Sequence, residues 1–456
     1  MSNVTITENI KKQNSKKIEE ENKKLEEMLM SEINPDVLAK LKEKNNQKEE
    51  SDEEIQEESL ANKFAINISV VGVGQAGSRI AEVMSKKGYA AGVINTSSQD
   101  LEYIKMRDDQ KLLLEGTLGG TGKDLDLGRE IFEQNEGLCL EFVEKVLGNN
   151  DMLYLAISGG GGTGSSSPDT IIPLMVQTGA PVGVIFVLPK DSEDSQSKAN
   201  AIETLSRLAK LSTQNMISNL IVVDNAKIEQ IYADLSQAKF WETANEAIVE
   251  PLDVFNTLTA TPSRHTSLDP SDFARVISCG DCSVYGVVEV ENYMEETALA
   301  EAVIDSLNQS MLAEGFDLKQ TRVGGVIITG TKKVMDSLPA ININYCYSMI
   351  SEKTNGANIF QGVYDVHTKS DSVKIYTWFA GLGLPRTRID ILKEQSKALE
   401  AVAKEKEELR QSSMSLDLGR DQTSSTSDEI KRKIKKKNSG FSKLQRGSLI
   451  DARRRR

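Results

Sequence analysis

The chain has 456 residues, of which 39% are hydrophobic and 27% charged, and its formal net charge is -13 at pH 7. This length suits about two or three domains of ordinary size, and the negative charge argues against a surface that binds nucleic acid or anionic membrane throughout. No apolar run reaches the roughly 18 residues of a membrane span, and the N-terminus lacks the apolar core of a signal peptide. We therefore expect a cytoplasmic protein without membrane insertion.

The first 62 residues are rich in Glu, Lys, Asn and Gln. Such a segment buries too little apolar surface to fold alone, so residues 1–62 are expected to form a charged, flexible extension. Residues 16–30 have the spacing of a charged amphipathic helix, which leaves a partner-binding helix as the alternative.

Strands and helices alternate between residues 63 and 258. Apolar strands are expected at 65–73, 91–94, 111–114, 152–157, 181–188 and 220–223, and helices at 78–87, 126–146, 197–211, 228–235 and 238–258. This alternation predicts an α/β fold with a doubly wound parallel sheet, which binds ligands at the carboxyl ends of its strands.

A domain boundary is expected near residues 259–275. Strands expected at 283–290, 324–329, 358–364 and 373–379, with one helix at 294–314, predict a second, smaller α/β domain over residues 259–385. A Glu/Lys-laced C-terminal helix is expected at 386–411, and a disordered tail over 412–456 with its basic clusters within 431–456.

Four consecutive glycines, Gly159–Gly162, lie between the strand at 152–157 and a helical pattern that begins at Asp169. A Gly-rich turn lets a ligand approach the backbone and directs free N–H groups and a helix N-terminus at an anion. Thr163 and Ser165 add hydroxyl donors, so a di- or triphosphate is the natural ligand. A tight turn with flexible glycines and no ligand is the plain alternative.

Two common nucleotide motifs explain this chain poorly. Gly72–Gly77 has the dinucleotide spacing, but that motif requires an acidic residue about 20 positions later, where the chain has Asn95 and Thr96. A nicotinamide enzyme would also leave the loop at 159–166 unexplained. A P-loop fails because Asp124 follows Lys123 where a hydroxyl must bind Mg²⁺.

The cysteines do not indicate a metal site. Cys279 and Cys282 have the spacing of a redox or metal pair, but there is no second pair, and neither His265 nor His367 has an evident partner. We expect reduced thiols and no protein metal centre.

Gly-rich loops at 72–77, 116–122 and 159–166 each follow a strand, so together they would line one edge of the sheet. The run Gly160–Ser165 resembles the signature of the tubulin/FtsZ superfamily. Gly74–Gly77 resembles the first tubulin loop, and residues 93–96 resemble the second loop of FtsZ. The similarity covers about residues 64–385 and implies a GTPase domain over 63–258, a central helix and the second domain.

The resemblance implies a GTP/GDP site with Mg²⁺, in which the glycine loops bind phosphates, Trp241 stacks on guanine, Asn225 and Asn245 bind its edge, and Glu193 binds the ribose. The implied nucleotide-binding residues are Gly74, Gln75, Ala76, Gly77, Asn95, Gly160, Gly161, Gly162, Thr163, Gly164, Ser165, Glu193, Asn225, Trp241 and Asn245.

Residues 267–272 resemble the family's catalytic loop, with Asp269 and Asp272 as its two carboxylates. In the family this loop enters the nucleotide pocket of the next subunit and polarises the attacking water, so hydrolysis requires a head-to-tail filament. Ser267 replaces the usual Asn, and Pro270 is unusual. The structural alternative for the two carboxylates is helix capping by one of them.

A C-terminal helix followed by a basic tail resembles the layout of TubZ-like plasmid and phage tubulins, in which the tail engages a DNA-bound adaptor and filaments move DNA. We therefore expect a self-assembling GTPase for DNA segregation or positioning, with an adaptor protein or DNA as the partner of residues 431–456. The alternatives are an FtsZ-like division-ring protein and a weakly hydrolysing structural homologue.

Overall fold

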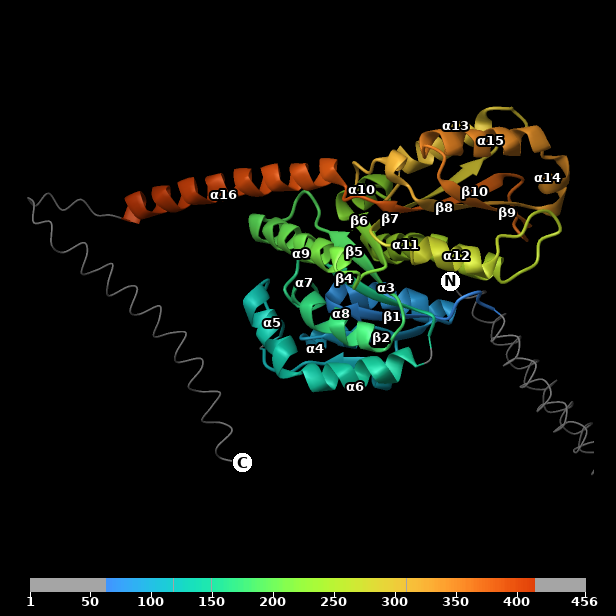
Figure 1. Ribbon diagram of the computed structural model, residues 1–456. Coiled ribbons are helices and arrows are strands. Elements are labelled where there is room, and N and C mark those ends of the chain that lie inside the picture. Colours follow the sequence, from blue (N-terminus) through green and yellow to red (C-terminus); the bar gives the residue numbers. More distant parts are fainter. Residues whose placement is uncertain (1–62, 118, 149, 309, 415–456) are drawn as a thin grey trace, which may run out of the picture. The chain divides into compact units, whose positions relative to one another are not determined.

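The structure is a computed structural model that describes residues 63–414, except residues 118, 149 and 309 (Figure 1). Of the described residues, those up to Lys397 belong to one compact unit, and Ala398–Met414 belong to another. The expectations for residues 1–62 and for the basic tail lie outside the described residues. Among the described helices, none has the length and apolar character needed to cross a membrane.

The described strands form a single ten-stranded sheet in the order β3-β2-β1-β4-β5-β6-β7-β10-β8-β9. Neighbours from β3 to β7 pair in parallel, β10 runs antiparallel to both β7 and β8, and β8 pairs in parallel with β9. The strands are β1 (Ile68–Val73), β2 (Ala90–Asn95), β3 (Lys111–Leu113), β4 (Met152–Ser158), β5 (Val182–Leu188), β6 (Asn219–Asp224), β7 (Cys282–Val290), β8 (Val323–Gly330), β9 (Asn358–Asp365) and β10 (Val373–Leu382).

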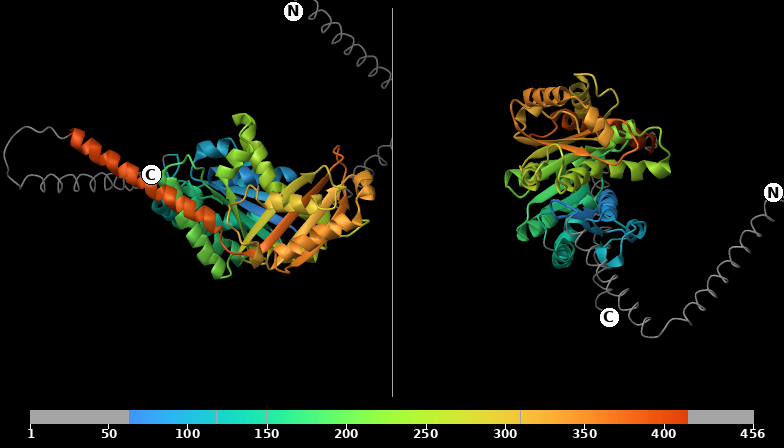
Figure 2. Two further views of the ribbon diagram at one scale, coloured as in Figure 1. Left: turned by 90° about the horizontal axis from the view of Figure 1, so that it is seen from above. Right: turned by 90° about the vertical axis from the view of Figure 1, so that its right-hand side faces the viewer.

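Helices cover both faces of this sheet. The α-helices are α3 (Gly74–Lys87), α4 (Ser98–Glu102), α5 (Leu125–Gln134), α6 (Glu136–Leu147), α7 (Thr163–Ser166), α8 (Pro168–Gln177), α9 (Ser195–Thr213), α10 (Asn225–Ile231), α11 (Gln237–Thr259), α12 (Pro270–Ile277), α13 (Ala298–Asn308), α14 (Lys332–Ser337), α15 (Ala340–Lys353) and α16 (Arg386–Met414). Short 3₁₀ turns are η1 (Asp108–Gln110) and η2 (Leu318–Gln320). In the second half of the sheet, α13 and α15 lie on one side of the strands and α11 and α12 on the other (Figures 1 and 2).

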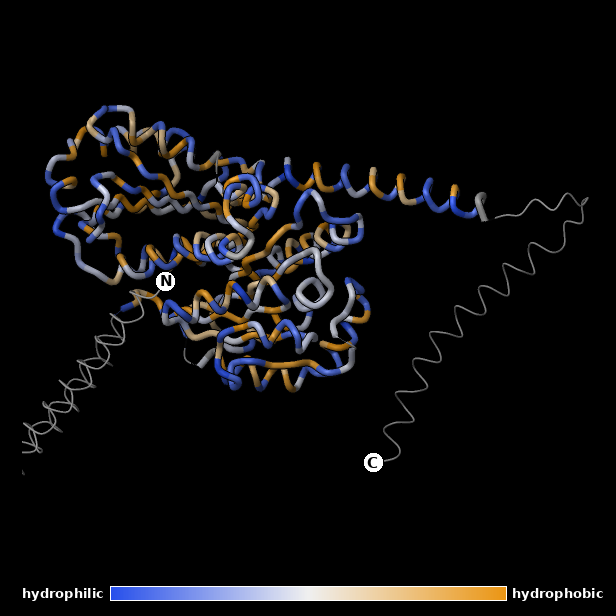
Figure 3. Tube along the Cα trace, turned by 180° about the vertical axis from the view of Figure 1, so that it is seen from behind, coloured by the Kyte–Doolittle hydropathy of each residue, from blue (hydrophilic) through white to orange (hydrophobic). Residues whose placement is uncertain are grey.

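The central strands β1, β4, β5 and β6 are buried almost throughout, because helices cover both of their faces. These strands consist mainly of apolar residues, and hydrophobic stretches of the chain lie in the interior of the fold (Figure 3). The doubly wound α/β fold predicted from the sequence is therefore confirmed.

The central helix α11 joins the two halves. Its residue Phe255 packs against Phe273 of α12 and Trp378 of β10, at ring-centroid distances of 5.7 and 5.8 Å. The hydroxyl of Tyr285 on β7 donates to the carbonyl of Ile248 at 2.9 Å. All of these rings are almost completely buried, so they fix α11 to the second half of the sheet.

Three local expectations were wrong. The helix expected at 126–146 is split into α5 and α6 at Asn135, whose backbone leaves the helical region. The helix expected at 294–314 is shorter, since α13 ends at Asn308. The second half also contains α14 and α15, which the sequence pattern did not indicate, because apolar and Asn residues alternate at the start of α15 and Ile341 there is exposed.

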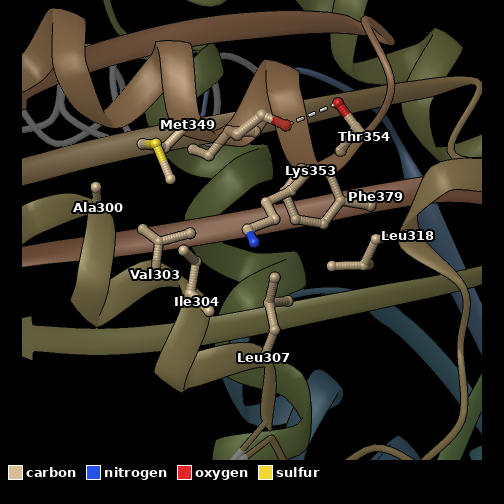
Figure 4. Close-up of a pocket in the computed structure, with 10 residues that line it drawn as sticks. Ala300, Val303, Ile304, Leu307, Leu318, Met349, Lys353, Thr354 and Phe379 are labelled. Atoms are coloured by element: carbon tan, nitrogen blue, oxygen red, sulfur yellow. Dashed lines mark hydrogen bonds between the residues drawn. The ribbon is translucent and has the colours of Figure 1, made fainter.

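A small apolar cavity of about 60 Å³ lies between α13, α15 and β10 (Figure 4). Val303, Leu307, Met349 and Phe379 contribute to its wall, and the Lys353 ammonium points into it.

Candidate functional site

Glycines bring the first and fourth βα turns together at the carboxyl ends of β1 and β4. A Cβ atom on Gly77 would lie 2.0 Å from the carbonyl oxygen of Ala156, so only glycine lets the start of α3 pack on β4. Gly74 has φ +72°, and a Cβ there would lie 3.1 Å from the amide nitrogen of Gly164. The first loop thus rests directly on the Gly-rich loop.

The Gly-rich loop uses its glycines for space, because none of Gly159 to Gly164 has a positive φ. A Cβ on Gly159 would collide with Phe186, and a Cβ on Gly162 would lie 1.9 Å from Oγ1 of Thr121. Gly161 differs from them, since its Cβ would meet no atom within 4 Å. Close packing therefore shapes the back of this loop, and Gly161 faces the open side.

Backbone N–H groups on this loop are available to an anion. Within the described part of the chain, the amides of Gly160, Gly161 and Gly162 donate no hydrogen bond. Consecutive free amides before a helix make a site for phosphate oxygens. The loop therefore fits the phosphate role that the sequence predicts.

The hydroxyl groups of Thr163 and Ser165, which were expected to face the ligand, form hydrogen bonds within the protein instead. The Oγ1 atoms of Thr163 and Thr96 are 2.7 Å apart and share a hydrogen bond. The Ser165 hydroxyl lies 3.0 Å from the carbonyl oxygen of Ser158 and 2.7 Å from that of Gly159. Both side chains fix the loop, which leaves the backbone as the source of donors.

Asn95 is buried and shapes the turn after β2. Its Oδ1 accepts hydrogen bonds from the amides of Thr96 at 2.8 Å and Ser97 at 3.2 Å. Asp100 lies between the two loops, where Gln75 Nε2 and Asn95 Nδ2 each approach one of its oxygens to 3.5 Å. Sequence reasoning missed this carboxylate, because no motif identifies it.

Glu193 lies over the Gly-rich loop: a Cβ on Gly160 would be 2.9 Å from its Oε2. Its Oε1 accepts a hydrogen bond from the amide of Lys190 at 2.8 Å. The buried Lys198 ammonium donates to the carbonyls of Asp191 and Glu193, and burial lowers its pKa. The segment 189–194 is thus held beside the predicted phosphate loop.

The predicted base-binding residues follow β6. Half-buried Trp241 has the ammonium of Lys190 5.0 Å and the guanidinium of Arg79 5.8 Å from its ring. Asn245 lies one turn further along α11 and is 8% exposed, with no hydrogen bond from its carboxamide to the described residues. Asn225 is half-buried at the start of α10.

A buried ion pair supports this region, and no sequence motif indicates it. Arg388 of α16 approaches Asp224 with Nε 2.7 Å from Oδ2, and both side chains are about 95% or more buried. Burial raises the pKa of Asp224, and the charge of Arg388 opposes that shift. The same guanidinium contacts Asp191 at 2.9 Å, so Arg388 ties segment 189–194 to the start of α10.

The two predicted catalytic carboxylates lie away from these loops. The C-terminal part of α11 contacts the chain just before β1, where Asn256 binds the backbone of Ile66. Asn245 and Thr259 are separated by about 21 Å along the helix at 1.5 Å per residue. Asp269 and Asp272 lie at the start of α12, whose Phe273 packs against Phe255 in the C-terminal part of α11, so they lie toward the opposite end of the central helix from Trp241.

The Asp269 carboxylate neither caps a helix nor is buried. It is the N-cap residue of α12 by position, but its side chain makes no capping hydrogen bond and it is exposed. Asp272 is 25% exposed and 4.0 Å from Arg275. Leu268, just before them, is buried and anchors the loop. Of the described residues, no group of three or more acidic, His or Cys side chains could hold a metal ion.

Comparison with known proteins identifies the fold family. Residues 67–233 match the tubulin/FtsZ family GTPase domain, and residues 254–393 match the TubZ-like C-terminal domain of tubulin/FtsZ-like proteins. The cell division protein FtsZ 1 of Pyrococcus horikoshii is 30% identical over 267 residues, which cover 57% of this chain and 67% of that protein. The chain belongs to the tubulin/FtsZ family.

Other tubulin/FtsZ proteins align over more of the chain. The tubulin-like protein CetZ of Pyrococcus abyssi is 28% identical over 348 residues, covering 74% of this chain and 92% of that protein. A GTPγS-form protofilament of Bacillus thuringiensis serovar israelensis TubZ matches with a TM-score of 0.67 at 18% identity, over 77% of this chain and 95% of that one. The family resemblance read from the glycine motifs is thereby confirmed.

Proposed function

We propose that this tubulin/FtsZ protein binds GTP and hydrolyses it within head-to-tail filaments. The observation that carries the proposal is the separation of the two half-sites. The glycine loops lie at the carboxyl ends of the strands, and the exposed Asp269 and the half-buried Asp272 lie toward the far end of α11. One chain cannot join them, but a second copy stacked end to end can.

The nucleotide-binding half uses the backbone for phosphates and side chains for the base. The free amides of Gly160 to Gly162 bind phosphate oxygens, and Gly161 leaves room for them. Trp241 stacks on guanine, and the unbonded carboxamide of Asn245 binds its edge together with Asn225. Glu193, which lies beside Gly160, binds the ribose in this proposal.

Mg²⁺ fits this site as a phosphate-bound ion. It is usually held by one or two carboxylates together with substrate phosphates, rather than by a cage of protein ligands. Asp100 and Gln75 supply oxygen atoms beside the first and second loops. When bound, the ion would neutralise charge on the phosphates.

Hydrolysis needs a water molecule placed in line with the terminal phosphate bond. The carboxylates of Asp269 and Asp272 from the adjacent copy accept hydrogen bonds from that water and orient it. Water attacks the γ-phosphorus, the bond to the β-phosphate oxygen breaks, and GDP and phosphate are released. Turnover therefore depends on assembly.

A role in segregating or positioning plasmid or phage DNA fits the TubZ-like match and the basic composition of residues 431–456. In this role the tail binds a DNA-bound adaptor or DNA phosphates.

One observation favours the weakly hydrolysing structural homologue as the second candidate. Ser267 stands where the family has Asn, and its hydroxyl oxygen accepts a hydrogen bond from the Ser263 amide at 2.9 Å. That oxygen supports the loop rather than facing a ligand, so in this second candidate the two aspartates alone orient the water.

Light scattering of the purified full chain tests the proposed function. We expect scattering to rise after addition of GTP with Mg²⁺, to fall as GTP is consumed, and not to rise with GDP. Phosphate release should rise more than linearly with protein concentration, because each site needs a second copy. Absence of any GTP-dependent rise across salt and Mg²⁺ concentrations would refute assembly.

A further inference from the structure

The loop that leads from α11 to the two carboxylates is tied to the edge strand β9. The Ser263 hydroxyl donates to the carbonyl of Val363, and the Val363 amide donates to the carbonyl of Thr266 at 2.8 Å. The Leu268 amide donates to the hydroxyl of Tyr364 at 2.8 Å. Successive points of the loop are thus fixed to two neighbouring residues of one strand.

Arg264 adds a charged fork to this attachment. Its Nε and Nη2 donate to the two carboxylate oxygens of Asp365, and Nη2 also lies 2.6 Å from Oδ1 of Asp336 on α14. His265 Nε2 is 3.3 Å from the same Asp365. Hydrogen bonds from Arg264 hold the pKa of Asp365 below its usual range, so this carboxylate stays charged.

We propose that Arg264 and Asp365 are positioning residues for GTP hydrolysis. Their ion pair fixes the loop on β9, and through it the place of Asp269 and Asp272 on the surface that meets the next subunit. The inference rests on the proposed function, because the positioned carboxylates act on a neighbour's nucleotide. A displacement of about 1 Å in a catalytic group can cost up to about 10²-fold in rate.

A purely structural role predicts a different result. The side chains of Arg264 and Asp365 are 42% and 25% exposed, and solvent-exposed ion pairs of this kind contribute little to folding stability. The glycine loops and Trp241 lie toward the other end of α11. Loss of the pair should therefore leave the fold and GTP binding by the monomer intact.

Asp365→Asn in the full chain tests the proposal, because it removes the charge and keeps the shape. Lys333→Gln is the matched control, since Lys333 and Asp371 form a more exposed pair at 3.3 Å in the same half of the molecule. The measurements are GTP turnover per sedimented subunit, GTP affinity of the monomer, and amide hydrogen exchange of residues 261–272.

For Asp365→Asn we expect faster exchange in residues 261–272 and turnover per sedimented subunit about tenfold lower, with monomer GTP affinity unchanged. Asp365→Glu should restore part of the turnover, and Lys333→Gln should behave as wild type. Unchanged exchange, or faster exchange with wild-type turnover, overturns the positioning role. A wild-type protein that does not hydrolyse GTP overturns the proposed function instead, and with it this role, so the two failures are distinguishable.

Discussion

At the scale of single residues, Gly161 is the glycine of the loop 159–164 whose missing side chain faces open space. A methyl group there would contact no protein atom within 4 Å, whereas a methyl group at Gly77 would lie 2.0 Å from a backbone carbonyl oxygen. The absence of a side chain at Gly77 is needed for the packing of the fold, whereas its absence at Gly161 leaves room for the phosphates that we propose bind to this loop.

Gly161→Ala is therefore expected to weaken GTP binding by about tenfold and to leave the free energy of unfolding, measured in urea, within about 0.5 kcal/mol of wild type. Gly77→Ala should destabilise the fold by about 1–3 kcal/mol or more through overpacking. Gly137→Ala is the control, because Gly137 lies on α6 with no neighbour within 4 Å of its Cβ position. Equal GTP affinity of Gly161→Ala and wild type would contradict the phosphate role.

At the scale of elements, the start of α9 is joined by an ion pair to Lys123, which directly follows the Gly-rich loop at 116–122. Asp194 caps this helix by accepting a hydrogen bond from the Ser197 amide at 2.8 Å, and the Lys123 ammonium pairs with the same carboxylate. The hydrogen bond from Lys123, followed by that from Ser197, lowers the pKa of Asp194 to about 2.

The sign of the resulting pH dependence follows from the lowered pKa. The ionised carboxylate contributes its stabilisation fully above its ordinary pKa of 3.8, and loses it as the pH falls toward about 2. Asp194→Asn should therefore be less stable than wild type at pH 5, and the difference should shrink between pH 4 and pH 2. Urea unfolding of both proteins across this range measures it, and a difference that stays constant would show that Asp194 has no such role.

The elements also show how far sequence reasoning reaches. The first half was predicted because buried parallel strands read as apolar runs and each ligand loop has its own glycine pattern. The attachment to β9 of the loop that precedes Asp269 was not predicted, because Arg264 and Asp365 are 101 residues apart and neither belongs to a motif. The single sheet was also missed, because β6 and β7 pair only at Leu220 and Ile221.

At the scale of the whole molecule, a site divided between two copies predicts complementation between defective subunits. Asp269→Ala should abolish most turnover and keep GTP-dependent assembly, because its own nucleotide loops are intact. Gly161→Ala retains intact carboxylates but binds GTP weakly. Mixed at a fixed total concentration, the two should hydrolyse more GTP than the sum of the separate proteins, since some filament contacts then join two intact halves.

Phosphate release against mixing ratio measures this complementation. The curve should pass through a maximum between the two pure proteins, and a straight line between its end points would contradict a shared site. Asp371→Asn mixed with Asp269→Ala serves as the control, because Asp371 lies in an exposed surface pair outside both halves of the proposed site.

The chain contains two tryptophans, and the fold gives them opposite surroundings. Trp378 is fully buried among Phe255, Phe273 and Tyr285, and Trp241 is half-buried beside two cations at the predicted base site. Their emission spectra should consequently differ, with a constant contribution from Trp378 and a quenchable one from Trp241. Trp378 fluorescence thus serves as an internal reference, and quenching of Trp241 fluorescence reports the binding of a guanine base without an added label.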